Sequence, residues 1–182
     1  MDPQPHNQLT TTDPQDELLY SVDENDTVLG KVTRKEAHSN PNIIQRTIGV
    51  FIFNKDGKAL IQKRSATKDT FPNHWGIGVG GHAEYGTSYI ETAVRELKEE
   101  IGIDASPSAL KEVGKILLRV PQESELWHIY RYRLGNEKLS FNSEEIQETK
   151  FVTIDELGHM LRDPNMEWKD QAKRLYDEFL KK

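Results

Sequence analysis

The stretch GGHAEYGTSYIETAVRELKEEIGI, Gly80 to Ile103, decides the fold. Ser88 followed by Glu91 forms a capping box, which marks the first turn of a helix. Apolar residues then recur at helical spacing and define one buried stripe, and Gly102 is a natural stop. The stretch therefore predicts a helix over residues 88–101, preceded by a glycine loop that allows close approach of a ligand to the backbone.

Three carboxylates share one side of this predicted helix. On a helical wheel, Glu96, Glu99 and Glu100 fall within an arc of roughly 100°, nearly opposite the apolar stripe. Like charges at this spacing repel one another. A solvated helix face would explain them, but the neighbouring glycines favour a site for Mg²⁺ or Mn²⁺, which prefer oxygen ligands. Such an ion would relieve the repulsion, polarise a phosphoryl oxygen and activate a water.

Composition narrows the class of protein. The 182 residues fit one domain, and the net charge of −6 argues against a protein that coats a nucleic acid polymer, though not against a small phosphorylated substrate. The sequence has no apolar run of membrane-spanning length and no secretory signal pattern, so we expect no membrane partner and a cytoplasmic location. The absence of cysteine excludes disulfides, thiolate catalysis and cysteine zinc sites.

The order of the predicted elements indicates the fold class. Residues 1–16 are polar and proline-containing and predict a flexible N-terminal tail, and residues 17–182 predict a single domain. Two hairpins are expected over 18–34 and 45–65, then a short strand entering the glycine loop. Strands near 112–120, 125–135 and 149–152 follow the central helix, with helices after the last of them. This order predicts an α+β fold with a mixed β-sheet.

The spacing of residues in the opening stretch resembles a known motif. Gly81, five residues, Thr87, seven residues, then Arg95-Glu96-Leu97, Glu99-Glu100 and Gly102-Ile103 is similar to the Nudix box, here residues 81–103. The resemblance covers most of the chain. It implies a Nudix α/β/α sandwich and metal-dependent attack of water on a small-molecule diphosphate, such as a nucleoside diphosphate linked to another moiety. A homodimer is expected from the resemblance alone.

The resemblance assigns roles to the helix carboxylates by position. Glu99 and Glu100 would be catalytic metal ligands for Mg²⁺ or Mn²⁺, and Glu96 would ligate the metal or help to orient the water. The carbonyl of Gly80 or Gly81 would supply another oxygen. The sequence thus predicts a metal site between the helix and the glycines before it.

Two further groups complete the predicted site. A later loop supplies another acid in the family, and here Glu144 and Glu145 are the candidates, of which Glu145 aligns better. Arg64, Lys63 and Lys68 follow the second strand of a hairpin and are expected to contact the substrate's phosphates. The alternative for all of these is a solvated turn or strand end.

One position departs from the box. Thr87 stands where the family usually has a glutamate that pairs with the box arginine. Glu91, one turn before Arg95, could pair with that arginine instead, although it is also the capping-box residue. A non-catalytic nucleotide-binding module therefore remains the alternative to an enzyme.

The flanking sequence resembles the branch that contains isopentenyl-diphosphate isomerase and related hydrolases. In those isomerases a cysteine just before the Gly-His pair carries out protonation, and Gly80 stands there in this chain. His38 and His82 match two positions of the isomerase histidine set, but Gln45 stands near the third. The incomplete set and the intact glutamates favour diphosphate hydrolysis over isomerisation.

Overall fold

The computed structural model describes residues 11, 13–121 and 123–181. The tail predicted over residues 1–16 lies mostly outside this part of the chain. Where that segment is described, Asp13 is buried, accepts a hydrogen bond from the backbone N–H of Asp69 and pairs with Lys68. The packed part of the chain therefore begins before residue 17, earlier than the sequence predicts.

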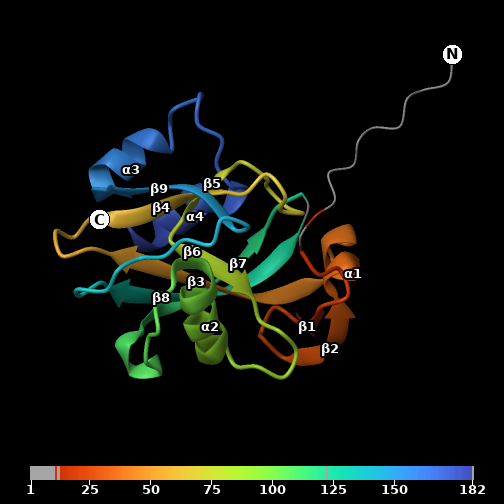
Figure 1. Ribbon diagram of the computed structural model, residues 1–182. Helices are drawn as coiled ribbons and strands as arrows, with labels where there is room; N and C mark the ends of the chain where they lie inside the picture. The colour runs from red at the N-terminus through yellow and green to blue at the C-terminus, as the bar shows by residue number, and fades with distance from the viewer. Residues whose placement is uncertain (1–10, 12, 122, 182) are drawn as a thin grey trace, which may run out of the picture.

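The described residues form one sheet with helices on both faces (Figure 1). Its strands are β1 (Leu18–Val22), β2 (Val28–Thr33), β3 (Ile44–Phe53), β4 (Ala59–Arg64), β5 (Trp75–Ile77), β6 (Val79–His82), β7 (Lys111–Arg119), β8 (Ser124–Arg133) and β9 (Ile146–Val152). The helices are α1 (Arg34–Ser39), α2 (Tyr89–Ile101), α3 (Ile154–Met160) and α4 (Asp170–Phe179), and Pro107–Ala109 forms a 3₁₀ turn.

Strand β3 organises the sheet. It pairs in parallel with β8 along its whole length, and it pairs antiparallel with β1, β4 and β6. Strand β4 in turn pairs antiparallel with β5 and β9, and β7 pairs with β8. The sheet therefore mixes parallel and antiparallel pairs, which confirms the predicted α+β class with a mixed sheet.

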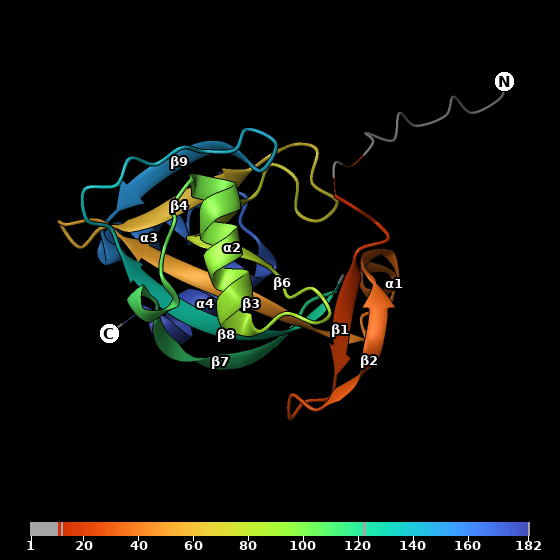
Figure 2. The same ribbon diagram turned by 60° about the horizontal axis from the view of Figure 1, so that its bottom comes forward.

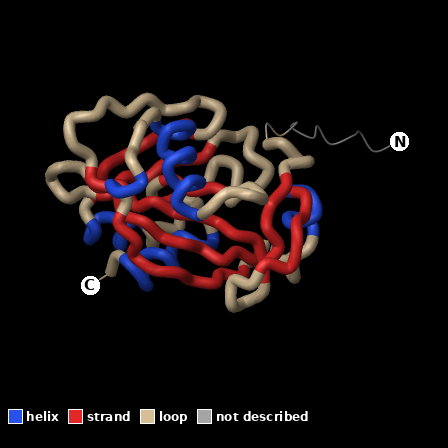
Figure 3. Tube along the Cα trace, turned by 90° about the horizontal axis from the view of Figure 1, so that it is seen from below, coloured by secondary structure: helices blue, strands red, loops and turns tan. Residues whose placement is uncertain are grey.

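Two apolar cores lie on opposite faces of the sheet. On one face, Ala93, Leu97 and Ile101 of α2 pack against a cluster that includes Ile48 of β3. On the other face, residues of α3 and α4 pack against a cluster that includes Phe51 of the same strand. Figure 2 shows α2 in front of the strands and α4 behind them, and Figure 3 shows the strands between helical segments. This arrangement confirms the expected α/β/α sandwich.

The ends of α2 follow the sequence prediction. Ser88 is the N-cap and forms a reciprocal capping box with Glu91, and Gly102 ends the helix with a φ of 72°. A left-handed residue at this position is favourable for glycine because it has no Cβ. Both hairpins and the helix after β9 are confirmed as well, and the N-cap of that helix is Thr153.

The glycine segment before α2 differs from the prediction. Gly80 and Gly81 lie within strand β6, which pairs with β3, rather than in a loop. The break between β5 and β6 falls at Gly78, where φ is 68° and an added Cβ would overlap with the carbonyl oxygen of Val50. Strand pairing therefore fixes the backbone that faces the carboxylates of α2.

No helix in the described ranges combines the length and apolar character that crossing a membrane requires.

Candidate functional site

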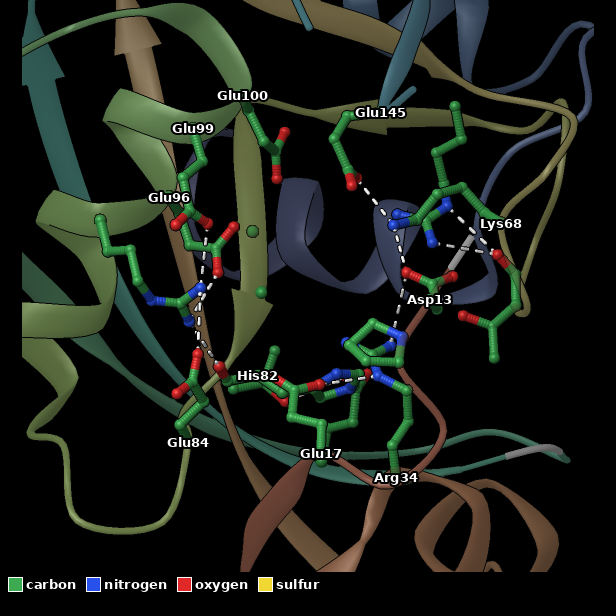
Figure 4. Close-up of a pocket in the computed structure, with 18 of the residues that line it drawn as sticks. Asp13, Glu17, Arg34, Lys68, His82, Glu84, Glu96, Glu99, Glu100 and Glu145 are labelled. Carbon is green, nitrogen blue, oxygen red and sulfur yellow. Dashed lines mark hydrogen bonds and ion pairs between the residues drawn. The ribbon is translucent and has the colours of Figure 1, made fainter. Parts of the chain in front are cut away.

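A polar cavity of about 300 Å³ lies beside the last turns of α2. Its lining comes from α2, β6, the start of β8, the segment after β4, the loop before β9 and the residue that precedes α4. Figure 4 shows Glu96, Glu99 and Glu100 on one side of this cavity and Glu145 with Lys68 across from Glu100. The structure thus brings together the predicted carboxylates from two separate parts of the chain, and Glu144 stays exposed outside the lining.

Glu96 is held against the glycines of β6. Its side chain is 11% exposed, and Arg95 Nη2 lies 3.0 Å from its Oε1. A Cβ added at Gly81 would overlap with this carboxylate, so only glycine leaves the space that Glu96 occupies. Burial, followed by the negative charge of Glu100, raises the pKa of Glu96 above its ordinary value, although Arg95 opposes the shift.

Glu100 lies deeper than the other acids of α2. It is 5% exposed and accepts a hydrogen bond of 2.8 Å from Nε2 of Gln62 on β4. Burial, followed by the negative charge of Glu145, raises its pKa, and the Gln62 hydrogen bond only partly offsets this. Among the described residues, Glu96 and Glu100 have only one directly paired cation between them, Arg95, so the charge of a bound divalent ion would allow both carboxylates to ionise.

The acids that pair with Arg95 differ from the one that the sequence predicts. Arg95 Nη1 lies 3.4 Å from Glu84 and 3.0 Å from Glu99, while Glu91 is used by the capping box at Ser88. Among the described residues, Arg95 pairs with Glu84, Glu96 and Glu99 and not with Glu91, so the expected Glu91–Arg95 pair is wrong. The Thr87 hydroxyl donates to the backbone carbonyl of Glu84 at 2.8 Å, which ties it to the segment that carries Glu84.

The three predicted phosphate-binding cations have different surroundings. Arg64 lines the cavity and donates from Nε and Nη2 to the backbone carbonyl of Thr70. Lys68 also lines the cavity, but it already pairs with Asp13 and with Glu145, the latter at 2.7 Å. Lys63 is half-buried on β4 and is not among the residues that line this cavity.

A second acidic group, absent from the sequence predictions, lines the cavity at the start of β8. Glu123 and Glu125 are 1% and 2% exposed, and Gln171 Nε2 donates to both, at 2.8 and 2.7 Å. Glu125 also accepts hydrogen bonds from Thr47 and Trp127. Their two-residue spacing, which puts side chains on one face of a strand, is the signal that could have identified them.

His38 and His82 lie next to this acidic pair. The nitrogens of the two rings and a carboxylate oxygen of Glu123 lie within 4.8 Å of one another, close enough to share a metal ion. Burial is the largest of the causes that lower the pKa of His82 to about 4, so its imidazole is neutral near pH 7 and can offer a lone pair. Gln45, which stands near the third position of the isomerase histidine set, is fully buried on β3.

Three other charged residues at the cavity were also not predicted. Asp13 and Arg34 belong to a network of ion pairs with Glu17 and Asp69. Lys169 is half-buried, and its pKa is lowered by burial and then by the charge of Arg64, against the attraction of nearby carboxylates. In the sequence, Lys169 lies near the start of the amphipathic C-terminal segment that predicts a closing helix, where no motif marks it.

Comparison with known proteins places the chain in a family. The NUDIX domain family matches residues 44–177. Isopentenyl-diphosphate Delta-isomerase of Streptomyces avermitilis is 34% identical over 83% of this chain and 79% of its own length. An uncharacterised Nudix hydrolase of Pseudomonas aeruginosa is 32% identical over 75% of this chain and 78% of its own.

A solved structure agrees with these similarities. The crystal structure of DR0079 from Deinococcus radiodurans superposes with a TM-score of 0.74 and 25% identity, covering 90% of this chain and 99% of that one. The match of the family to most of the chain, the sequence relatives and the shared fold point to one conclusion. The chain belongs to the NUDIX domain family.

Proposed function

We propose that this protein is a metal-dependent hydrolase that cleaves the diphosphate bond of a small molecule, a nucleoside diphosphate linked to another moiety or a related diphosphate. The observation that carries the proposal is the meeting of Glu96, Glu99, Glu100 and Glu145 at one polar cavity. Arg64 and Lys169 bring positive charge to the same volume. Oxygen ligands beside cationic groups suit a metal ion together with a phosphorylated substrate.

The carboxylates of α2 fit a divalent ion. Glu96 and Glu100 are buried with raised pKa values, and Gly81 leaves the space that the Glu96 carboxylate fills. Glu96, Glu99 and Glu100, with Glu145 and the carbonyl of Gly81, would hold Mg²⁺ or Mn²⁺. When bound, the ion would neutralise phosphate charge and polarise a phosphoryl oxygen.

The protein's own residues orient the reactants. Arg64 is fixed by the carbonyl of Thr70, so its remaining N–H groups can receive a phosphate at little entropic cost. Glu145 lies across the cavity from Glu100 and is held there by Lys68 (Figure 4). We assign to these two facing carboxylates the positioning of the attacking water and the acceptance of its proton.

Two alternatives find less support in the site. An isomerase would need an acid at the position of Gly80, where an added Cβ would lie 2.9 Å from the carbonyl oxygen of Ile48, and the chain has no cysteine. A non-catalytic module was suggested by Thr87, but Glu84 supplies the acid that pairs with Arg95. Arg95 therefore keeps an acidic partner despite Thr87, which favours an active enzyme over a non-catalytic module.

The test is a panel of nucleoside diphosphate derivatives and other small diphosphates, assayed for release of phosphate or monophosphate with Mg²⁺ or Mn²⁺. We expect turnover of at least one compound that is lost on chelation and in Glu99→Gln. Glu178→Gln is the matched control, because Glu178 is exposed on α4, outside the lining of the cavity. Inactivity of the wild type on every diphosphate, or full activity of Glu99→Gln, would contradict the proposal.

A further inference from the structure

The backbone at Lys169 is fixed by the sheet. The N–H of Lys169 donates to the carbonyl of Trp75 at 2.9 Å, and the N–H of Trp75 donates to the carbonyl of Glu167 at 2.8 Å. Trp168 forms a parallel bridge with Trp75, and its indole Nε1 donates to the carbonyl of Met160. Lys169 is also the N-cap of α4. The starting point of its side chain is therefore set by a strand on one side and a helix on the other.

The side chain of Lys169 is directed into the cavity. Its Cδ passes 3.6 Å from where a Cβ of Gly76 would be, so this glycine leaves room for the aliphatic part. Its Nζ lies 5.4 Å from the centroid of the Trp127 ring, and both residues line the same cavity. The ammonium group thus reaches, from the α4 face of the sheet, the volume that α2 reaches from the opposite face.

Lys169 forms no direct ion pair within the described part of the chain, although Glu100, Glu123 and Glu125 attract its charge from a greater distance. Arg34, Lys68 and Arg95 of the same cavity each have a carboxylate within ion-pair distance. Among the described residues, Lys169 Nζ has no carboxylate within 4.0 Å and no hydrogen bond, and Arg64 is bonded only to a backbone carbonyl. The two cations Arg64 and Lys169 therefore face the cavity with their charge available to a ligand.

Stability alone does not account for this lysine. Withdrawing an ammonium from water without a paired carboxylate costs free energy, and an apolar side chain of similar length would avoid that cost. The contact between the ammonium group and the Trp127 ring stabilises the folded state by only about 1 kcal/mol. The oxygens of Glu125 accept hydrogen bonds from Thr47, Trp127 and Gln171, so Lys169 acts on Glu125 and Glu123 only through its charge, at longer range.

We propose that Lys169, together with Arg64, binds a phosphate group of the substrate on the side of the cavity away from α2. This inference rests on the proposed diphosphate hydrolysis and adds a residue to it. A diphosphate carries more negative charge than one divalent ion neutralises. The remaining negative charge needs positive charge supplied by the protein, which Lys169 and Arg64 provide.

The test is calorimetric binding of methylenediphosphonate, a diphosphate analogue with a non-hydrolysable bridge, in the presence of Mg²⁺. For Lys169→Met we expect binding weaker by about 10- to 100-fold, the loss of one charge-assisted contact. Lys169→Arg keeps the charge and should recover most of the affinity. Lys173→Met, an exposed lysine of α4, is the matched control and should bind like the wild type. The melting temperature of Lys169→Met should equal or exceed that of the wild type.

The outcomes separate this inference from the function on which it rests. Wild type and Lys169→Met that bind the analogue equally would overturn the role of Lys169 and leave the proposed hydrolase intact. Equal loss in Lys169→Met and Lys169→Arg would overturn it as well, because shape rather than charge would then matter. A wild type that binds no diphosphate with Mg²⁺ would refute the proposed function, and this inference with it.

Discussion

Asp26 at the β1–β2 turn and the buried acids Glu96 and Glu100 of α2 have pKa values that are shifted in opposite directions. Asp26 accepts hydrogen bonds from Arg46 Nε at 2.7 Å, from the Tyr89 hydroxyl at 2.9 Å and from Lys115 Nζ at 3.1 Å. Burial by itself would raise its pKa, but these donors outweigh it and the pKa is lowered. Glu96 and Glu100 are more buried and have fewer donors, and their pKa values are raised.

The number of donors around each carboxylate distinguishes Asp26, which has a structural role, from Glu96 and Glu100, the acids of the proposed metal site. Asp26 joins the turn to β3, β7 and α2 through donors that the protein itself supplies. Within the described ranges, Glu96 and Glu100 have only Arg95 and Gln62 as hydrogen-bond or ion-pair partners, so part of their charge is left for a ligand. A buried carboxylate whose own donors are too few is a better indicator of a cation site than a count of acidic residues.

The largest effect is expected for Glu100→Gln. Because Gln62 can still hydrogen-bond the new amide, the fold should be kept, while a metal ligand and its charge are lost. We expect kcat for the best substrate to fall by at least about 100-fold. The melting temperature without metal should stay the same or rise, since a buried charge is removed. A steady-state assay together with a thermal scan checks both, and unchanged turnover would remove Glu100 from the site.

Gly81→Ala should have a smaller effect on the same site. The new methyl group overlaps with the Glu96 carboxylate, so that side chain must move away from β6. We expect Mn²⁺ affinity to fall by about 10-fold, as for a misplaced ligand. Gly76→Ala is the control, since its methyl group would lie 3.6 Å from Lys169, an ordinary contact. Titration with Mn²⁺ distinguishes the two, and equal affinities would show that Gly81 does not position Glu96.

The Asp26→Asn variant tests whether Asp26 stabilises the fold without contributing to the metal site. Asn tolerates the φ of 70° at this position, so the change mainly removes the charge that Arg46 and Lys115 share. We expect the free energy of unfolding to fall by about 1–2 kcal/mol because the pairs are partly exposed. Metal affinity and turnover should not change. Urea denaturation measures the free energy of unfolding. A loss of Mn²⁺ binding in Asp26→Asn would show that the β1–β2 turn and the acids of α2 are not independent.

The smallest effect is a pH dependence of stability without metal. Glu96 and Glu100 have folded-state pKa values above those of the unfolded chain, so the folded state holds more protons. Their contribution is therefore fully present below the ordinary glutamate pKa and is lost as the pH rises through the raised values, from about pH 5 to about pH 8.

Thermal scans in that range should show a melting temperature that declines without metal. The decline should be weaker with saturating Mg²⁺, which stabilises the ionised carboxylates. It should also be weaker in Glu100→Gln. A melting temperature that rises with pH in the metal-free wild type would contradict the raised pKa values.

Local patterns in the sequence predicted the half of the site that one helix carries. The capping box, the apolar stripe and Gly102 define α2, and helical spacing alone puts Glu96, Glu99 and Glu100 on one side. Glu145 could be proposed only from the family resemblance, because its distance from α2 depends on the pairing of β9 with β4. The glycines of β6 were expected in a loop because their low strand propensity hides a strand that pairing with β3 imposes.

The other half of the site depends on tertiary packing. Lys169 reaches the cavity because Trp75 and Trp168 bring residues far apart in the sequence side by side. Glu123 and Glu125 lie at the start of a buried strand, where acids are rare, and their two-residue spacing places them on one face without showing that this face meets the acids of α2. Asp13 lies in a segment whose composition predicts flexibility, and only its contacts with Lys68 and Asp69 reveal its place.

The most direct test of the account is a crystal structure of the wild type grown with Mn²⁺, with anomalous diffraction used to locate the ion. The account predicts an anomalous peak within coordination distance of carboxylate oxygens of Glu96, Glu99 or Glu100, and no peak at Asp26. The absence of a peak at α2 under saturating Mn²⁺ would contradict the claim that these acids form the metal site.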